Sequence, residues 1–243
     1  MKEEIITFLE GKNLSDNSKT AYFYDLEQFV DVIHAKITDT NLRIYRASIA
    51  DFKPSVQKRK LSAVNQFLYY LYNKRFISNF YRLELPKVGI PKEHDAEILD
   101  LSNFYADTNQ YNGRLIALLI LEMGLLPSEI LQLKVADVNL DFQIIRIEKA
   151  GQKRIVPIPD QLIGELGTTL EGTYLLEKNG KTYSRQWRFR QLEAFLIEKN
   201  QATLSAQSLR EQYILRQREK GVEIYEIARN LGLKTMMTLE KYR

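Results

Sequence analysis

Apolar side chains recur at every third or fourth position through the first eighty residues of this chain, and this spacing restricts that part of it to helices. In residues 15–33 the repeat runs through Leu26 and Phe29, and a second repeat runs through residues 55–72. A stripe of this kind is buried only when its helix packs against other helices. The sequence therefore predicts a small helical bundle, in which a short helix over residues 2–10 joins the two longer ones.

The second half of the chain contains a stretch with a strand pattern. Residues 142–147 and 153–158 are alternating or apolar runs, and Lys149 and Gly151 lie between them. Two such runs predict a β-hairpin, here with a lysine in its turn. Helical spacing precedes the hairpin and returns after it, in residues 184–199, 205–220, 222–231 and 235–242. The predicted fold class is mainly α, with a small β-hairpin or sheet in the C-terminal domain.

Two prolines and a glycine stand among charged residues in the segment 85–95, which is typical of a linker between domains. A chain of 243 residues with 44% hydrophobic residues is long enough to bury two cores. We therefore expect a helical N-terminal domain over residues 1–84, the linker, and a C-terminal domain over residues 96–243.

Several classes of protein are excluded by what the sequence lacks. The chain has no cysteine, and its two histidines are His34 and His94, so disulfides, thiol catalysis and a histidine-rich metal site are excluded. No apolar run approaches the eighteen residues of a membrane-spanning helix, and the first residues do not form a signal peptide pattern. We expect a cytoplasmic protein with no membrane partner, no metal and no small-molecule cofactor.

Positive charge is concentrated near the C-terminus. Residues 181–243 hold 13 Lys or Arg against 7 Asp or Glu, whereas the whole chain has 35 against 31. Solvated basic helix faces and a nucleic-acid surface would both produce this distribution.

The last forty residues carry a spaced motif that separates these alternatives. It consists of Leu-Ser-Ala-Gln-Ser-Leu-Arg over residues 204–210, then Gly221, Leu-Gly-Leu over residues 231–233, and Tyr242. This spacing resembles the C-terminal box of the tyrosine recombinases of the Xer type (XerD-like), whose members carry LSxHxLRH, a helix ending in Gly, LGH and a nucleophilic Tyr. The resemblance implies DNA recombination or integration in a two-domain, C-shaped clamp on double-stranded DNA.

Three retained residues have roles that the resemblance implies. Tyr242 matches the nucleophile that forms a 3′-phosphotyrosyl link to DNA. Arg210 matches an arginine that grips the phosphate, and Lys149 matches the general-acid lysine of the hairpin.

Three other positions depart from the family pattern. Leu126, in the segment that resembles TGLRxSEL, stands where the first catalytic arginine belongs, and Gln207 and Leu233 replace two histidines. Gln can still donate a hydrogen bond, but Leu cannot. The loss of one donor to a developing anion costs about 3–4 kcal/mol, or about a hundredfold to a thousandfold in rate. The active site is therefore expected to be incomplete.

Two N-terminal segments, residues 14–29 and 58–67, resemble the DNA-clamping domain of the same family. Cations placed ahead of an apolar helix stripe can reach phosphates without disturbing the core. The candidate DNA-binding residues are Lys19, Lys58, Arg59 and Lys60.

Two functions remain open. The chain is either a tyrosine recombinase that is weak or inactive alone, and that depends on a second recombinase subunit for its missing groups, or a non-cleaving DNA-binding or regulatory protein derived from one. A protein-binding adaptor is disfavoured by the basic C-terminal region and the retained Tyr, Arg and Lys. Because the chain ends at Arg243, directly after Tyr242, we expect weak self-assembly.

Overall fold

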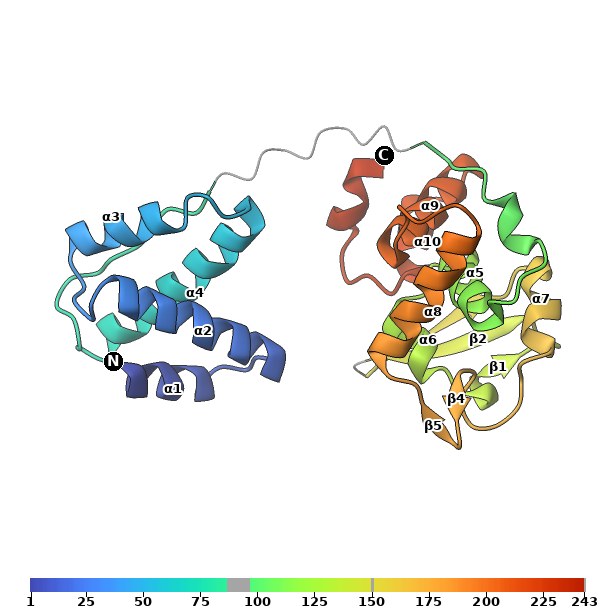
Figure 1. Cartoon of the computed structure of the whole chain (residues 1–243), viewed down its shortest axis with the longest axis horizontal. Coiled ribbons are helices and arrows are strands. Elements are labelled where there is room, and N and C mark those ends of the chain that lie inside the picture. Colours follow the sequence, from blue (N-terminus) through green and yellow to red (C-terminus); the bar gives the residue numbers. More distant parts are fainter. Residues whose placement is uncertain (87–96, 150, 243) are drawn as a thin grey trace. The chain divides into compact units, whose positions relative to one another are not determined.

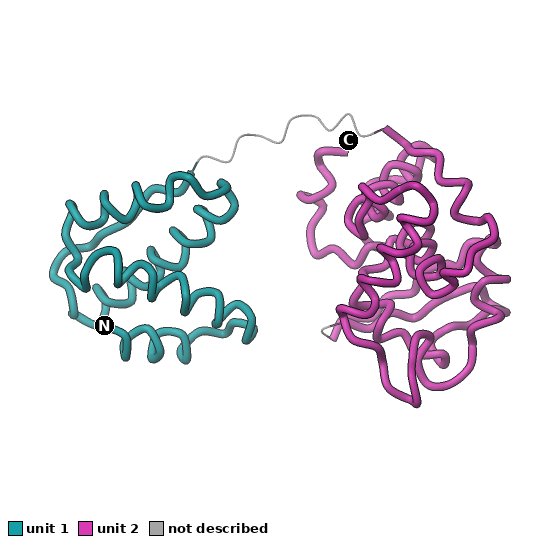
Figure 2. The backbone as a smooth tube through the Cα atoms, in the orientation of Figure 1, with its two compact units in different colours: residues 1–90 teal, residues 91–243 magenta. Residues whose placement is uncertain are grey.

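The chain folds into two compact units, residues 1–90 and 91–243 (Figures 1 and 2). This computed structural model describes residues 1–86, 97–149 and 151–242. Most of the predicted linker, residues 87–95, therefore lies outside the described residues. Within the described parts, no helix is both long enough and apolar enough to cross a membrane.

The described residues of the first unit, 1–86, form the helices α1 (Lys2–Glu10), α2 (Asp16–Val32), α3 (Asp39–Ser48) and α4 (Pro54–Asn73), which Figure 1 labels. The helices predicted over residues 2–10, 15–33 and 55–72 are confirmed. The Ser15 side chain accepts a hydrogen bond from the backbone N–H of Ser18 and so begins α2. Helix α3 was not predicted, because its buried face is short and consists of Leu42 and Tyr45.

Aromatic rings from all four of these helices, α1 to α4, form the centre of the first unit. Phe29 of α2 meets Tyr45 of α3 edge to face at 4.9 Å between ring centroids, and Phe8 meets Phe67 of α4 at 5.5 Å. All four side chains are buried. The apolar stripe read from the sequence is therefore the core of this bundle.

In the second unit, helices α5 (Tyr111–Met123) and α6 (Pro127–Gln132) precede an antiparallel sheet. Its strands are β1 (Val138–Asn139), β2 (Ile144–Lys149) and β3 (Gln152–Pro157), in the order β1-β2-β3. The predicted hairpin is confirmed, but the placement of Lys149 in its turn is wrong. Lys149 is the last residue of β2 and pairs with Gln152, so the strands extend closer to the turn than the sequence pattern indicated.

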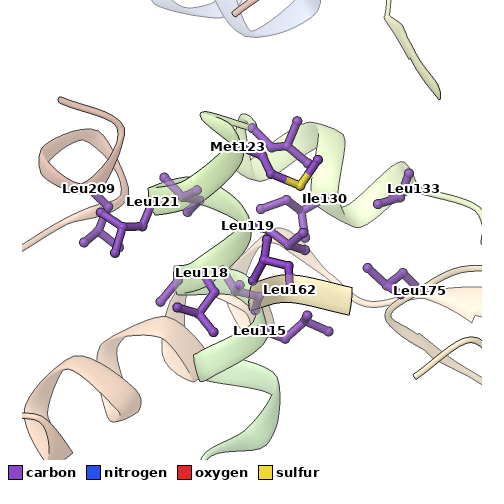
Figure 3. Close-up of a cluster of buried hydrophobic side chains, with 14 of the residues drawn as sticks. Leu115, Leu118, Leu119, Leu121, Met123, Ile130, Leu133, Leu162, Leu175 and Leu209 are labelled. Carbon is purple, nitrogen blue, oxygen red and sulfur yellow. The ribbon is translucent and has the colours of Figure 1, made fainter. Parts of the chain in front are cut away.

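Helix α5 is the centre of the second unit. Figure 3 shows Leu115, Leu118 and Leu119 of α5 among side chains from other elements of this core. Helix α5 packs most extensively on α8 (Arg185–Glu198) and α9 (Ala206–Glu219). The approach to α8 is close at Gly113, where an added Cβ would lie 2.3 Å from the carbonyl oxygen of Gln191.

The second unit has further, shorter elements, of which Figure 1 labels α7, α10, β4 and β5. They are α7 (Asp160–Gly167), the short strands β4 (Glu177–Lys178) and β5 (Lys181–Thr182), α10 (Ile224–Asn230), and the 3-10 helices η1 (Ser102–Tyr105), η2 (Val135–Asp137) and η3 (Met236–Tyr242). Helices α8, α9 and α10 confirm three of the predicted segments, and η3 confirms the fourth as a 3-10 helix.

A small separate cluster holds the end of the chain against α9 and α10. Tyr213, Ile227 and Leu239 are buried in it, and Leu233 and Tyr242 pack against them partly exposed. Because this cluster fixes η3, it also fixes the position of the Tyr242 ring.

Candidate active site

Tyr242, at the end of η3, is held by two charged neighbours. Its phenol Oη donates a hydrogen bond to Glu211 Oε1 at 2.6 Å, and Lys241 Nζ donates to the same oxygen at 3.2 Å. Lys241 Nζ also lies 4.5 Å from the centre of the Tyr242 ring. Burial and the bond to Glu211 raise the pKa of Tyr242 above its usual value, while Lys241 opposes this effect. The phenol is therefore protonated at neutral pH.

Arg210 lies on α9, one residue before Glu211. Its Nη2 donates a hydrogen bond to the backbone carbonyl of Leu231 at 2.9 Å, which fixes one edge of the guanidinium. Burial lowers the pKa of Arg210 from its usual value, the charge of Glu129 opposes this, and the charge of Arg154 adds to it. Arginine has so high a pKa that the group stays charged despite this shift.

One pocket of about 480 Å³ collects five of the six catalytic or degenerate positions predicted from the sequence. Tyr242 and Arg210 line it together with the three departing positions. These are Leu126, Gln207 and Leu233. A phenol and a guanidinium thus border a space in which two of the three departing positions, Leu126 and Leu233, have side chains of carbon atoms only.

Arg154 of β3, which does not line the pocket, connects three segments that are distant in the sequence. Its guanidinium binds Glu129 of α6 through two hydrogen bonds of 2.9 and 2.8 Å, and its Nε donates to the carbonyl of Asn230 at 2.9 Å. Gly232 has a φ of +65°, and a Cβ there would lie 2.8 Å from Arg154 Nη1. Glycine at this position therefore allows both the left-handed backbone and the close approach of the guanidinium. We call this group the Arg154 clasp.

Glu129 also fixes the position of Leu126. Glu129 Oε2 accepts the backbone N–H of Leu126 at 2.7 Å, at the start of α6. Burial alone would raise the pKa of Glu129, but the bonds to Arg154 and Leu126 and the charges of Arg154 and Lys149 together lower it below its usual value. The clasp is therefore an ionised pair at neutral pH.

Residues 93–243, more than half of the chain, match the model of the phage integrase family. The chain belongs to the phage integrase family. A tyrosine recombinase XerD-like protein of Streptococcus sanguinis is 69% identical to it over 243 residues, which cover the whole of both chains. A protein of the same name from Streptococcus gordonii is 60% identical, again over the whole of both chains. The resemblance to XerD-like tyrosine recombinases is confirmed.

Solved structures of phage integrase relatives share the fold. A lambda integrase dimer bound to a core site matches all of this chain and 95% of that one, with a TM-score of 0.79 and 14% identity. The XerH site-specific recombinase bound to its difH substrate matches all of this chain and 81% of that one, with a TM-score of 0.72 and 14% identity. The predicted mainly helical fold with a small antiparallel sheet is confirmed.

Lys149, the general-acid position implied by the phage integrase pattern, does not line the pocket. Its side chain is exposed at the end of β2. The charge of Lys149 nevertheless contributes to the lowered pKa of Glu129, so its ammonium group lies within electrostatic range of the clasp. A hairpin end is a position from which a long side chain can reach a bound substrate.

The N-terminal cations differ in what they offer to DNA. Lys58 and Arg59 are exposed and Lys19 is half-buried. Arg59 donates a hydrogen bond to Asp25, and Lys60 Nζ binds Asp25 Oδ1 at 2.9 Å. Lys60 is only 8% exposed, so a phosphate contact by its ammonium group would require this ion pair to open.

Sequence reasoning missed the site contributions of Arg154, Glu129 and Glu211. The first two lie in segments with a family-like pattern, but their pairing joins positions 25 residues apart in the chain. Glu211 follows the retained Arg210 directly, and its contact with Tyr242 spans 31 residues. Among the described residues, no group of three or more acidic or histidine side chains is placed to hold a metal ion.

Proposed function

We propose that this chain is a site-specific tyrosine recombinase that binds double-stranded DNA, and whose strand cleavage is weak or absent when it acts alone. The observation that supports this proposal is the shared pocket, which pairs Tyr242 and Arg210 with Leu126 and Leu233. The nucleophile and one phosphate ligand are present, while aliphatic side chains occupy positions that could otherwise donate hydrogen bonds.

In this reaction the Tyr242 Oη attacks the scissile phosphorus and forms a 3′-phosphotyrosyl bond while the 5′ oxygen leaves. Arg210 binds a non-bridging oxygen through the edge of its guanidinium that does not face Leu231. Lys149 reaches from the end of β2 to protonate the departing 5′ oxygen. Attack by the 5′ hydroxyl of another strand reverses these steps and rejoins the DNA.

The missing arginine sets the rate that we expect. Leu126 has no hydrogen bond donor in its side chain, so one charge on the transition state is left without a partner. Loss of one such donor costs about a hundredfold to a thousandfold in rate. We propose that a second recombinase subunit in the cytoplasm supplies the absent groups when the chain acts at its natural site.

The proposed DNA contacts in the N-terminal unit are made by Lys19, Lys58 and Arg59, with Lys60 holding Asp25 beside them. The solved relatives support DNA as the partner, because the XerH and lambda integrase structures contain bound DNA. We further propose that the two units together clamp the duplex.

Covalent trapping on a nicked recombination half-site tests this function. The native chain and Tyr242→Phe are incubated with the labelled half-site, with and without a fully equipped relative carrying its own Tyr→Phe change, and separated on a denaturing gel. A covalent adduct from the native chain that disappears in Tyr242→Phe supports a recombinase. An adduct that forms only with the relative supports dependence on a partner.

The second candidate is a non-cleaving DNA-binding or regulatory protein derived from a recombinase. The observation that favours it is the pair of aliphatic side chains, Leu126 and Leu233, in the pocket wall. DNA binding at the half-site without an adduct under either condition would establish this second function and exclude the first.

A further inference from the structure

Two charged residues in the pocket lie outside the retained catalytic set: Glu211, directly after Arg210 on α9, and Lys241, directly before Tyr242 in η3. We propose that Glu211 accepts the phenol proton of Tyr242 as it attacks DNA, and that Lys241 orients this carboxylate and places a positive charge beside the reacting phosphate. This inference rests on the proposed recombinase function, and it assigns to that reaction a base and a cation found within this chain.

The geometry brings all three groups to one oxygen atom. Glu211 Oε1 accepts the Tyr242 Oη at 2.6 Å and the Lys241 Nζ at 3.2 Å. The side chains of Glu211 and Lys241 are 24% and 31% exposed, and both line the pocket that Arg210 and Tyr242 share. The carboxylate is thus within hydrogen-bonding distance of the attacking atom and on the substrate side of the fold.

The state of the phenol requires a nearby proton acceptor. Tyr242 is protonated at neutral pH, because burial and Glu211 raise its pKa. The proton must therefore leave while the new bond to phosphorus forms, and a group that takes it must be within hydrogen-bonding distance of the Oη. Glu211 Oε1 already accepts that hydrogen bond.

The step balances with groups that the chain supplies. The Tyr242 Oη–phosphorus bond forms and the bond from phosphorus to the 5′ oxygen breaks. The phenol proton passes to Glu211 Oε1, and the 5′ oxygen takes a proton from Lys149. In the rejoining step the Glu211 carboxylic acid returns its proton to the Tyr242 oxygen as the phosphotyrosyl bond breaks.

Lys241 is better placed than Arg154 to compensate for the arginine absent at Leu126. Arg154 is committed to two hydrogen bonds with Glu129, and its side chain is 13% exposed, so it cannot turn to a phosphate without breaking the clasp. Lys241 carries its charge into the pocket beside the nucleophile. A lysine on a flexible stem acts as a point charge and does not require the fixed fork of an arginine.

The test measures adduct formation on the nicked half-site under single-turnover conditions, for the native chain, Glu211→Gln and Lys241→Gln. Glu211→Gln keeps the size of the side chain but cannot take a proton, so its rate should fall by about a hundredfold or more. The rate of adduct formation in Lys241→Gln should fall by a smaller factor, about tenfold. Glu219→Gln changes an exposed residue on α9, the helix of Glu211, and its rate should match that of the native chain. Thermal unfolding of each variant checks folding.

Two further readouts separate a base from a structural contact. Added formate should restore adduct formation in Glu211→Ala, which also serves if Glu211→Gln does not fold. In a ring-labelled sample, with the Tyr242 resonance assigned by Tyr242→Phe, the pKa of the phenol should fall in Glu211→Gln, because the carboxylate that raises it is gone.

The outcomes distinguish this inference from the function on which it rests. A native adduct with an equal or faster rate in Glu211→Gln would overturn the inference and leave the recombinase function standing. Absence of an adduct from the native chain, with and without the equipped relative, would overturn both. An unchanged pKa of Tyr242 in Glu211→Gln would overturn the proposed contact itself.

Discussion

In the proposed reaction, Leu126 is the position at which a missing side-chain donor lowers the rate of cleavage most. It lines the same space as Tyr242 and Arg210, and its side chain cannot donate a hydrogen bond. We predict that Leu126→Arg increases the rate of adduct formation by about a hundredfold, because one preorganised donor is worth about that factor. The measurement is the nicked half-site assay, with Leu126→Met as the control for side-chain size. Equal rates for Leu126→Arg and Leu126→Met would refute this prediction.

Two lysines of α4 that are close in sequence should differ in what their substitution changes: DNA binding for Lys58, and stability for Lys60. Lys58 is exposed, so Lys58→Met should leave stability unchanged, weaken DNA binding and reduce the slope of log affinity against log salt by about 1. Lys60 is buried against Asp25, so Lys60→Met should lower the free energy of unfolding by about 1.5–3 kcal/mol. Fluorescence anisotropy over a salt series and urea denaturation measure the two effects. A loss of salt dependence in Lys60→Met with full stability would reverse these assignments.

Among secondary-structure elements, the contact of α6 with β3 depends on an ionised carboxylate. The pKa of Glu129 is lowered in the folded chain, so its stabilising contribution is complete above the unfolded value of about 4.5 and is lost as the pH falls through the lower folded value. At pH 7, Glu129→Gln should lower the free energy of unfolding by about 3 kcal/mol, because it leaves Arg154 buried without its partner charge. Urea denaturation of both proteins from pH 7 to pH 3 should show the difference between them shrinking on acidification. A constant difference would contradict the assigned pKa shift.

The packing of α5 on α8 should tolerate no added methyl group at Gly113. A Cβ at Gly113 would lie 2.3 Å from the Gln191 carbonyl oxygen. Gly113→Ala should therefore lower the free energy of unfolding by about 1–3 kcal/mol. Gly164 in α7 is the matched control, because a Cβ there meets nothing within 4 Å. Gly164→Ala should raise the free energy of unfolding by about 0.5–1 kcal/mol, because alanine has a higher helix propensity than glycine. Thermal and urea unfolding measure both variants. A change in the free energy of unfolding of the same sign in Gly113→Ala and Gly164→Ala would contradict this account.

Sequence patterns predicted the elements better than the contacts between them. Long helices such as α2 and α4 were predictable because their apolar stripes repeat over several turns. Helix α7 was missed because its eight residues include Gly164 and Gly167 and bury only two apolar side chains. The hairpin was found, but the position of Lys149 depended on the register of its last pair, which periodicity does not fix.

The candidate site was predictable as far as local motifs reach. Tyr242, Arg210 and the three departing positions were named from the resemblance of their motifs to the family pattern, and the fold brings them to one pocket. Glu211 was not recognised as a site residue, because its contact with Tyr242 depends on how η3 returns to α9. A local sequence pattern does not predict that η3 packs against α9. This packing depends on the cluster of buried residues from α9, α10 and η3.

At the scale of the whole molecule, the two units have separate hydrophobic cores. We predict that fragments covering residues 1–86 and 97–243 each fold alone and each bind DNA more weakly than the full chain. Joining two binding modules raises affinity by about 10²–10⁴ through effective concentration, without any new contact. Circular dichroism would test folding, and anisotropy on the same half-site would compare affinities. A fragment that binds as tightly as the full chain would show that one unit alone accounts for the interaction.

The Arg154 clasp separates the residues that build the pocket from the residues that would act within it. Arg154, Glu129 and Gly232 hold α6, β3 and the end of α10 in place, and none of them lines the pocket. Natural selection can therefore change side chains such as Leu126 or Leu233 without loss of the architecture. Substitutions in the pocket leave the contacts of the clasp in place, so a protein built in this way can lose an activity, or regain it, and keep its fold.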